Sequence, residues 1–171
     1  MFAYRLTKFD PSKRDRDGRS LGDDWTSISD IGRTICGTIF SEADYLRSED
    51  AYVQATKTLL SEAGIGAMGV IDIETQSIKH LHINDGVFAA CRKIQNNEIV
   101  TGNALENVLR GCLREYMWCR MSDLHGSYIH FGYDYYVYIG LPNSALKTLL
   151  PRGIFLEECV SPYMEEEPDA E

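Results

Sequence analysis

The segment that decides the fold covers residues 127–141, with the sequence SYIHFGYDYYVYIGL, and it holds five of the ten tyrosines of the chain. Aromatic and β-branched residues favour a pleated, half-buried surface. The segment therefore predicts two strands, residues 128–131 and 135–139, joined by a turn at residues 132–134. We expect this hairpin to lie at the centre of a sheet.

Side chains of a strand alternate between its two faces. The second strand of the hairpin should therefore carry Tyr135, Val137 and Ile139 on one face, and Tyr136 and Tyr138 on the other. One explanation for tyrosines on both faces is packing in the core and against neighbouring strands. A recognition surface is the alternative, because tyrosine is enriched where proteins bind one another.

Outward from the hairpin, apolar periodicity predicts further strands and two long helices. The strands fall at residues 2–6, 68–73, 78–83 and 154–160, and the helices at residues 41–63 and 101–121. We therefore expect the α+β class, with a sheet of five or six strands, mostly antiparallel, packed by the two helices.

The chain has 171 residues, which is enough for one domain with a real core. We expect that domain over residues 1–163. The residues after it are strongly acidic, and this predicts a disordered tail over residues 164–171.

The formal net charge of the chain is −9. A protein that binds nucleic acid directly needs a basic surface, so we expect no such binding and favour a cationic protein partner. No run approaches the ~18 apolar residues that a membrane span requires, and the first residues lack the apolar core of a signal peptide. The chain is therefore expected to be cytoplasmic, with no membrane contact.

One of the two tryptophans stands in an unusual polar context, residues 23–30 with the sequence DDWTSISD. A buried tryptophan that anchors a capped turn explains this segment. A recognition surface is the alternative, and we expect partner-binding residues from this loop and from the hairpin turn. They are Asp23, Asp24, Trp25, Asp30, Tyr133, Asp134 and Tyr136.

Signatures of catalysis are weak. The sequence has no nucleophile elbow, no phosphate-binding loop and no dinucleotide fingerprint. His130 and Asp134 flank the hairpin turn and could share a proton. His80, His82 and Asp85 could approach a metal ion, but they provide no fourth ligand. We expect no catalytic residue, no cofactor and no metal, and we expect the five cysteines, which show no C-x-x-C spacing, to be reduced.

Three strings of the sequence, residues 25–32 (WTSISDIG), 130–136 (HFGYDYY) and 161–163 (SPY), together resemble a family of small bacterial proteins of poorly defined function. Some small acidic proteins of this kind are immunity proteins, which neutralise the toxin domains of contact-dependent growth inhibition or related polymorphic toxin systems. The resemblance implies no catalytic residue. Our leading hypothesis is an immunity protein against a cognate toxin, most plausibly a basic nuclease domain. The alternatives are a small enzyme with a site near His130 and Asp134, and a regulatory protein-binding module.

Overall fold

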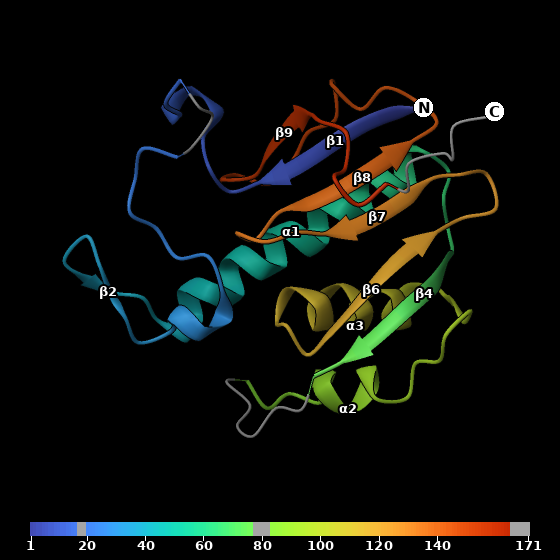
Figure 1. The fold of residues 1–171 in the computed structure, drawn as a ribbon, viewed down its shortest axis with the longest axis horizontal. Helices are drawn as coiled ribbons and strands as arrows, with labels where there is room; N and C mark the ends of the chain where they lie inside the picture. Colours follow the sequence, from blue (N-terminus) through green and yellow to red (C-terminus); the bar gives the residue numbers. More distant parts are fainter. Residues whose placement is uncertain (17–19, 77–82, 165–171) are drawn as a thin grey trace, which may run out of the picture.

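A computed structural model describes residues 1–16, 20–76 and 83–164, and its centre is a seven-stranded sheet (Figure 1). The strand order is β5-β4-β6-β7-β8-β1-β9, and every neighbouring pair is antiparallel. The strands are β1 (Phe2–Thr7), β4 (Met68–Thr75), β5 (Ile99–Val100), β6 (Met117–Ser122), β7 (Tyr128–Phe131), β8 (Val137–Leu141) and β9 (Phe155–Glu158).

The remaining elements are three helices, two 3₁₀ turns and a small separate hairpin. They are α1 (Glu42–Glu62), α2 (Val87–Cys91), α3 (Gly102–Leu113), η1 (Pro11–Lys13), η2 (Ile28–Asp30), β2 (Thr34–Ile35) and β3 (Thr38–Ile39). The α+β class of a single domain is confirmed, with more strands than the five or six expected. The expected strand at residues 78–83 falls almost entirely outside the described residues, as do residues 165–171 of the expected tail.

The hairpin β7–β8 lies in the middle of the sheet, as predicted. Val137 and Ile139 are fully buried on the face that packs against the helices. The turn is longer than expected, because Asp134 and Tyr135 both adopt left-handed backbone angles, with φ of 57° and 62°. The second strand therefore begins at Val137, two residues later than predicted.

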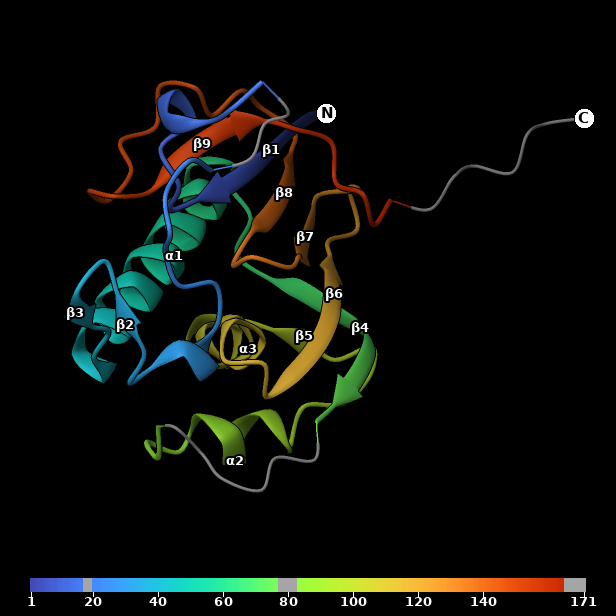
Figure 2. The same ribbon diagram turned by 60° about the vertical axis from the view of Figure 1, so that its left-hand side comes forward.

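Helices α1 and α3 cover one face of the sheet (Figure 2). Helix α1 begins at a capping box in which Ser41 Oγ accepts a hydrogen bond from the Asp44 amide at 3.2 Å. Gly64, with φ of 74°, follows its end. The predicted helix at residues 41–63 is confirmed.

The predicted helix at residues 101–121 is wrong in its second half. Helix α3 ends at Leu113, and Glu115, with φ of 58°, reverses the chain into strand β6. In β6 every second residue is buried, namely Met117, Cys119 and Met121, which is the period of a strand and not of a helix. This additional central strand is one reason why the sheet is larger than expected.

Among the described residues, no helix lies on the opposite face of the sheet, which is partly covered by the segment after β9. Ser161 Oγ lies 2.8 Å from His130 Nδ1, and the Tyr163 ring contacts the rings of Trp118, His130 and Tyr138. Within the described ranges, no helix is both long and apolar enough to cross a membrane.

Candidate binding cleft

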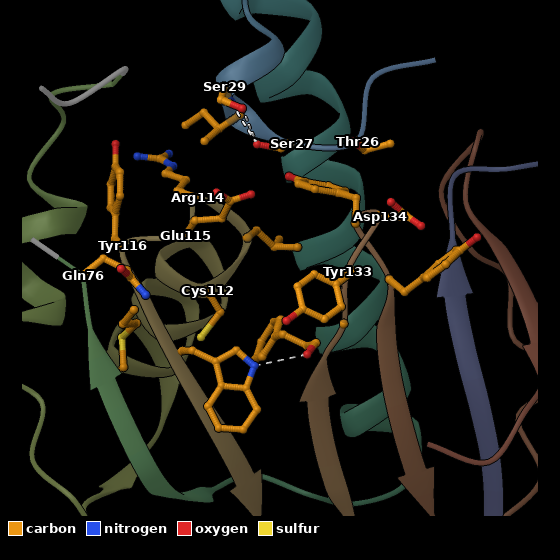
Figure 3. Close-up of a pocket in the computed structure, with 18 of the residues that line it drawn as sticks. Thr26, Ser27, Ser29, Gln76, Cys112, Arg114, Glu115, Tyr116, Tyr133 and Asp134 are labelled. Atoms are coloured by element: carbon orange, nitrogen blue, oxygen red, sulfur yellow. Dashed lines mark hydrogen bonds between the residues drawn. The ribbon is translucent and has the colours of Figure 1, made fainter. Parts of the chain in front are cut away.

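A cleft of about 830 Å³ opens where strands β6 and β7 separate (Figure 3). The two strands pair at only three positions, and the pair Arg120–His130 is the last before they diverge. The side chain of Trp118 bridges the gap, because its Nε1 donates a hydrogen bond to the carbonyl of Phe131 at 3.3 Å. These two central strands therefore part at one end of the sheet and leave a concave site.

Three segments that are distant in sequence form the walls of this cleft. They are the η2 turn, the chain between α3 and β6, and the turn between β7 and β8. Tyr163 adds a wall from the segment after β9. Aromatic side chains dominate the lining: Tyr116, Trp118, Phe131, Tyr133, Tyr135, Tyr136 and Tyr163.

The Asp, Glu, Lys and Arg side chains of the lining are mostly carboxylates. Glu74, Glu115 and Asp134 are exposed at the cleft. Arg114 is the one basic side chain among the described lining residues, and it is 1% exposed. The mouth of the cleft is therefore acidic.

The charge of Arg114 is neutralised inside the protein. Its Nε and Nη2 donate to the two carboxylate oxygens of Glu49 at 2.6 and 2.7 Å, and its Nη1 donates to Asp85 at 2.8 Å. These carboxylates, and the hydrogen bonds they accept, raise the pKa of Arg114 against the opposing effect of burial. Arg110 also binds Glu49, with 2.6 Å between Arg110 Nη1 and Glu49 Oε1, so this carboxylate holds two guanidinium groups. The network joins α1, α3 and the start of α2, and its role is structural.

Backbone strain is concentrated around the cleft. Glu115, Asp134 and Tyr135 all line it, and all have positive φ angles although none is glycine. Asp72, with φ of 55°, lines an adjoining hollow of about 520 Å³ that shares Glu74, Trp118 and Tyr163 with the cleft. Such conformations cost on the order of 1–3 kcal/mol each and gather at functional sites.

The hydroxyl of Tyr135 is a further unusual feature of the lining. The residue is buried, and its Oη finds no hydrogen-bond partner of acceptable geometry among the described residues. Burial, with the nearby phenol of Tyr45, raises the pKa of Tyr135 well above its usual value. The cleft wall thus contains a neutral phenol with unused hydrogen-bonding capacity.

Two of the predicted binding residues belong to the packing and not to the surface. Trp25 is 6% exposed, and its ring lies 4.7 Å from both the Phe40 and the Tyr135 rings. Asp30 is also 6% exposed and accepts hydrogen bonds from the amides of Thr26 and Ser27. Both side chains are therefore buried, which matches the alternative of a buried tryptophan that anchors a capped turn.

The other predicted binding residues lie at the surface beside the cleft. Tyr133 is 86% exposed, Asp23, Asp24 and Asp134 are exposed, and Tyr136 is partly buried against Phe9. The loop and the hairpin turn are adjacent, because Trp25 packs on Tyr135.

Lys8 lies between the loop and the hairpin turn. Its Nζ is 2.6 Å from the Asp24 carboxylate and 4.3 Å from the Trp25 ring centre. Burial lowers the pKa of Lys8, while the negative charges of Asp24, Asp30 and Asp134 oppose that effect. Lys8 therefore forms an ion pair with Asp24 in the loop and interacts with the charge of Asp134 in the hairpin turn.

The structure does not pair His130 with Asp134. His130 lies on the helix-free face of the sheet, 5% exposed, stacked on the Tyr128 ring and bonded to Ser161. Asp134 lies in the exposed turn, and no contact between the two is found in the described chain. Ser161 is 3% exposed, so its hydroxyl is not accessible as a nucleophile.

No metal site emerges from the described residues, since no three His, Cys, Asp or Glu side chains gather there. His80 and His82 lie outside those residues, and Asp85 accepts hydrogen bonds from Arg114 and from the Val87 amide. The five cysteines are free thiols, and Cys112 Sγ lies 3.5 Å from Cys119 Sγ across the packing of α3 on β6.

The sequence analysis missed Glu74, Glu115 and Trp118 as lining residues. Trp118 was assigned to a helix, whereas the alternation of Met117, Cys119 and Met121 around it is the signal that identifies a strand with Trp118 on its other face. Glu74 and Glu115 have no sequence pattern that marks them as lining residues, because only the folded chain brings them to the same cleft.

The three strings that carry the family resemblance lie side by side in the structure. Trp25 contacts Tyr135, and His130 contacts Ser161. Comparison of the chain with protein-family models, with curated proteins and with solved structures gave no match. The cleft and the surface beside it are therefore interpreted from their own chemistry.

Proposed function

We propose that this protein is an immunity protein that binds a cognate bacterial toxin domain and neutralises it by covering its functional surface. The observation that carries the proposal is Tyr133, which is 86% exposed in the turn between β7 and β8, next to the exposed carboxylate of Asp134. Tyrosine with its apolar ring and polar hydroxyl is enriched among the residues that dominate binding energy. We name the exposed residues Asp23, Asp24, Tyr133 and Asp134 the acidic tyrosine surface.

Charge supports a basic partner. The chain carries a formal charge of −9, and the acidic tyrosine surface contributes three exposed carboxylates, of which Asp24 is paired with Lys8. Complementary charge speeds association and selects among partners. A toxin that acts on nucleic acid needs a basic surface to hold phosphates, so a nuclease domain is the toxin class that fits best.

The geometry of the surface also suits binding. A standard protein interface buries about 800 Å² on each partner. The hairpin turn and the loop at residues 23–30 are neighbours, and the buried Trp25 and Asp30 hold that loop in a defined shape. A partner would therefore meet a surface that is already ordered, which reduces the entropic cost of association.

Co-expression with any toxin-like domain that proves to be encoded next to this chain tests the proposal. We expect a complex that co-purifies at equal stoichiometry and restores growth. Tyr133→Ala and Asp134→Asn should weaken the complex, whereas Leu124→Ala, a truncation of another exposed side chain, should not. No complex and no rescue would refute immunity, and capture of a non-toxic partner at the same surface would indicate a regulatory module.

A further inference from the structure

We propose that the cleft binds the guanidinium of an arginine side chain, carried by the protein partner. The identity of the partner rests on the proposed function, but the preference for arginine rests on the cleft itself. Arginine stacks its planar guanidinium on aromatic rings and donates five N–H groups in a fixed fork. The cleft offers both kinds of contact.

The aromatic contact comes first from Trp118. Its ring is oriented by the hydrogen bond from Nε1 to the Phe131 carbonyl and by the Tyr163 ring, whose centre lies 6.4 Å away. The side chain remains partly exposed toward the cleft, and Tyr133 and Tyr163 line the same hollow. A cation over such rings is attracted by their negatively polarised faces, and tryptophan is the strongest of the aromatic residues in this respect.

The charge of the cleft selects a cation. Glu74 comes from β4, Glu115 from the turn before β6 and Asp134 from the hairpin turn, so three separate carboxylates line the cleft without forming one cluster. Arg114 offers no competing attraction for anions, because Glu49 and Asp85 already engage its guanidinium. A ligand in this cleft would therefore gain from positive charge and lose from negative charge.

Tyr135 also lines the cleft, but its hydroxyl is buried and has no hydrogen-bond partner in the part of the chain that the structure describes. The Tyr135 ring packs among Trp25, Tyr45 and Tyr52, so this hydroxyl belongs to the core packing behind the wall. A ligand in the cleft therefore meets aromatic rings and carboxylates, and these carry the preference for arginine.

The size of the cleft fits an arginine together with its backbone. Its volume of about 830 Å³ lies in the range of about 300–1,000 Å³ typical of sites for small ligands. The hollow exceeds a single side chain, so the residues next to the arginine would also enter. The positive φ angles of Glu115, Asp134 and Tyr135 present all three residues at the same hollow, which is consistent with a preformed site.

Titration with N-acetyl-arginine amide tests the proposal without any toxin. The readout is the indole N–H signal of Trp118 in a ¹⁵N-edited NMR spectrum. The sequence has two tryptophans, and Trp25 is buried behind the hairpin turn. We expect a saturable shift of the Trp118 signal, and no comparable shift with N-acetyl-citrulline amide, which has nearly the same shape but no charge.

Variants show whether the cleft is responsible. Glu115→Gln keeps the side-chain shape and should raise the Kd for the arginine probe roughly fivefold, and Trp118→Leu should do so at least as strongly when followed by backbone amide shifts. Glu158→Gln removes an exposed carboxylate from the edge strand β9 and should leave the Kd unchanged. Because Glu115 is exposed, its variant remains informative even if Trp118→Leu fails to fold.

Three results would overturn the inference: the absence of a saturable shift, equal binding of the citrulline probe, or equal weakening by Glu158→Gln. These outcomes are separable from the proposed function. A toxin complex that forms while the arginine probe fails to bind would refute only the role of the cleft. Binding of the probe in a protein that gives no rescue would refute only immunity.

Discussion

Arg114 and Glu49 form a bidentate ion pair in the interior of the protein, although 65 positions separate them in the sequence. The side chains are 1% and 0% exposed. Glu49 lies in α1, and Arg114 follows the last residue of α3 at the point where the chain turns toward the cleft. The pair therefore ties the first long helix to one wall of the candidate site.

Glu49→Gln should destabilise the protein by about 3–5 kcal/mol, because it removes the negative charge that compensates a buried guanidinium. Arg110 also donates to Glu49 at 2.6 Å, so both guanidinium groups lose one carboxylate, although Arg114 keeps Asp85 and Arg110 keeps Asp50 and Glu106. Urea unfolding measures the loss as a lower midpoint. Arg47→Ala breaks an exposed pair with Asp44 and serves as the control, with an expected effect of at most about 1 kcal/mol. Equal effects of the two variants would contradict this account.

His130 should make the stability depend on pH. Burial, with a smaller contribution from the positive charge of Arg120, lowers the pKa of His130 from its usual 6.5 to about 4. The unfolded chain therefore binds more protons than the folded protein between these values. Stability should be full above about pH 6.5 and should fall as pH decreases toward 4, by on the order of 1–3 kcal/mol from this group.

Unfolding free energies at several pH values test the contribution of His130. The carboxylates also make the unfolding free energy depend on pH, and they do so in both proteins. Compared with the unmodified protein, His130→Gln should therefore show a smaller decrease in unfolding free energy between pH 6.5 and 4. His125→Gln removes an exposed histidine and should show the same decrease in unfolding free energy between pH 6.5 and 4 as the unmodified protein. An unchanged slope in His130→Gln would show that the buried imidazole is not the group responsible.

Gly140→Ala should be costly because the Tyr128 ring lies directly on the backbone of Gly140. A Cβ atom there would stand 2.2 Å from Tyr128 Cε1 and 2.5 Å from its Cδ1. The ring would have to leave its stack on His130, and we expect a loss of about 1–3 kcal/mol. Gly22→Ala, at a position with no atom within 4 Å of the added carbon, is the control and should cost less than about 0.5 kcal/mol. Thermal or urea unfolding of both variants decides the comparison.

Tyr135→Phe should leave the stability unchanged or raise it by about 0.5–1 kcal/mol, since it removes a buried hydroxyl that has no partner within the described chain. Tyr45→Phe is the matched comparison. Its hydroxyl donates to the Leu113 carbonyl at 3.1 Å, so its removal should cost about 1 kcal/mol. A larger loss in Tyr135→Phe than in Tyr45→Phe would mean that the Tyr135 hydroxyl is satisfied in solution.

The parts of the fold that the sequence predicts are those determined by local pattern. The strands of the central hairpin follow from alternation within residues 127–141, and α1 follows from a serine before an acidic first turn, an apolar stripe and a terminal glycine. Strand β6 was missed because Met117 and Met121 are four residues apart, a spacing that a helix also places on one face. Glu115 ends the helix through its left-handed backbone conformation, and the apolar pattern of the sequence does not reveal this conformation.

The candidate site was predicted only in part, for a different reason. Tyr133 and Asp134 stand in a turn, and turns of polar and aromatic residues are exposed wherever they fall. The cleft beside them exists because β6 and β7 separate after three pairs, and its carboxylates come from three elements. Likewise, Arg114 is buried only because Glu49, far away in the sequence, provides its counter-charge.

The position of β1 in the sheet has a consequence during synthesis of the chain. Leu6 pairs with Val137 on one side and with Leu156 on the other. At a ribosomal rate of about 5–20 residues per second, the first strand waits on the order of ten seconds before its earlier partner is made. During that time both edges of β1 are unpaired and its apolar residues are accessible, so nascent chains bearing β1 are candidates for chaperone binding until β8 leaves the ribosome.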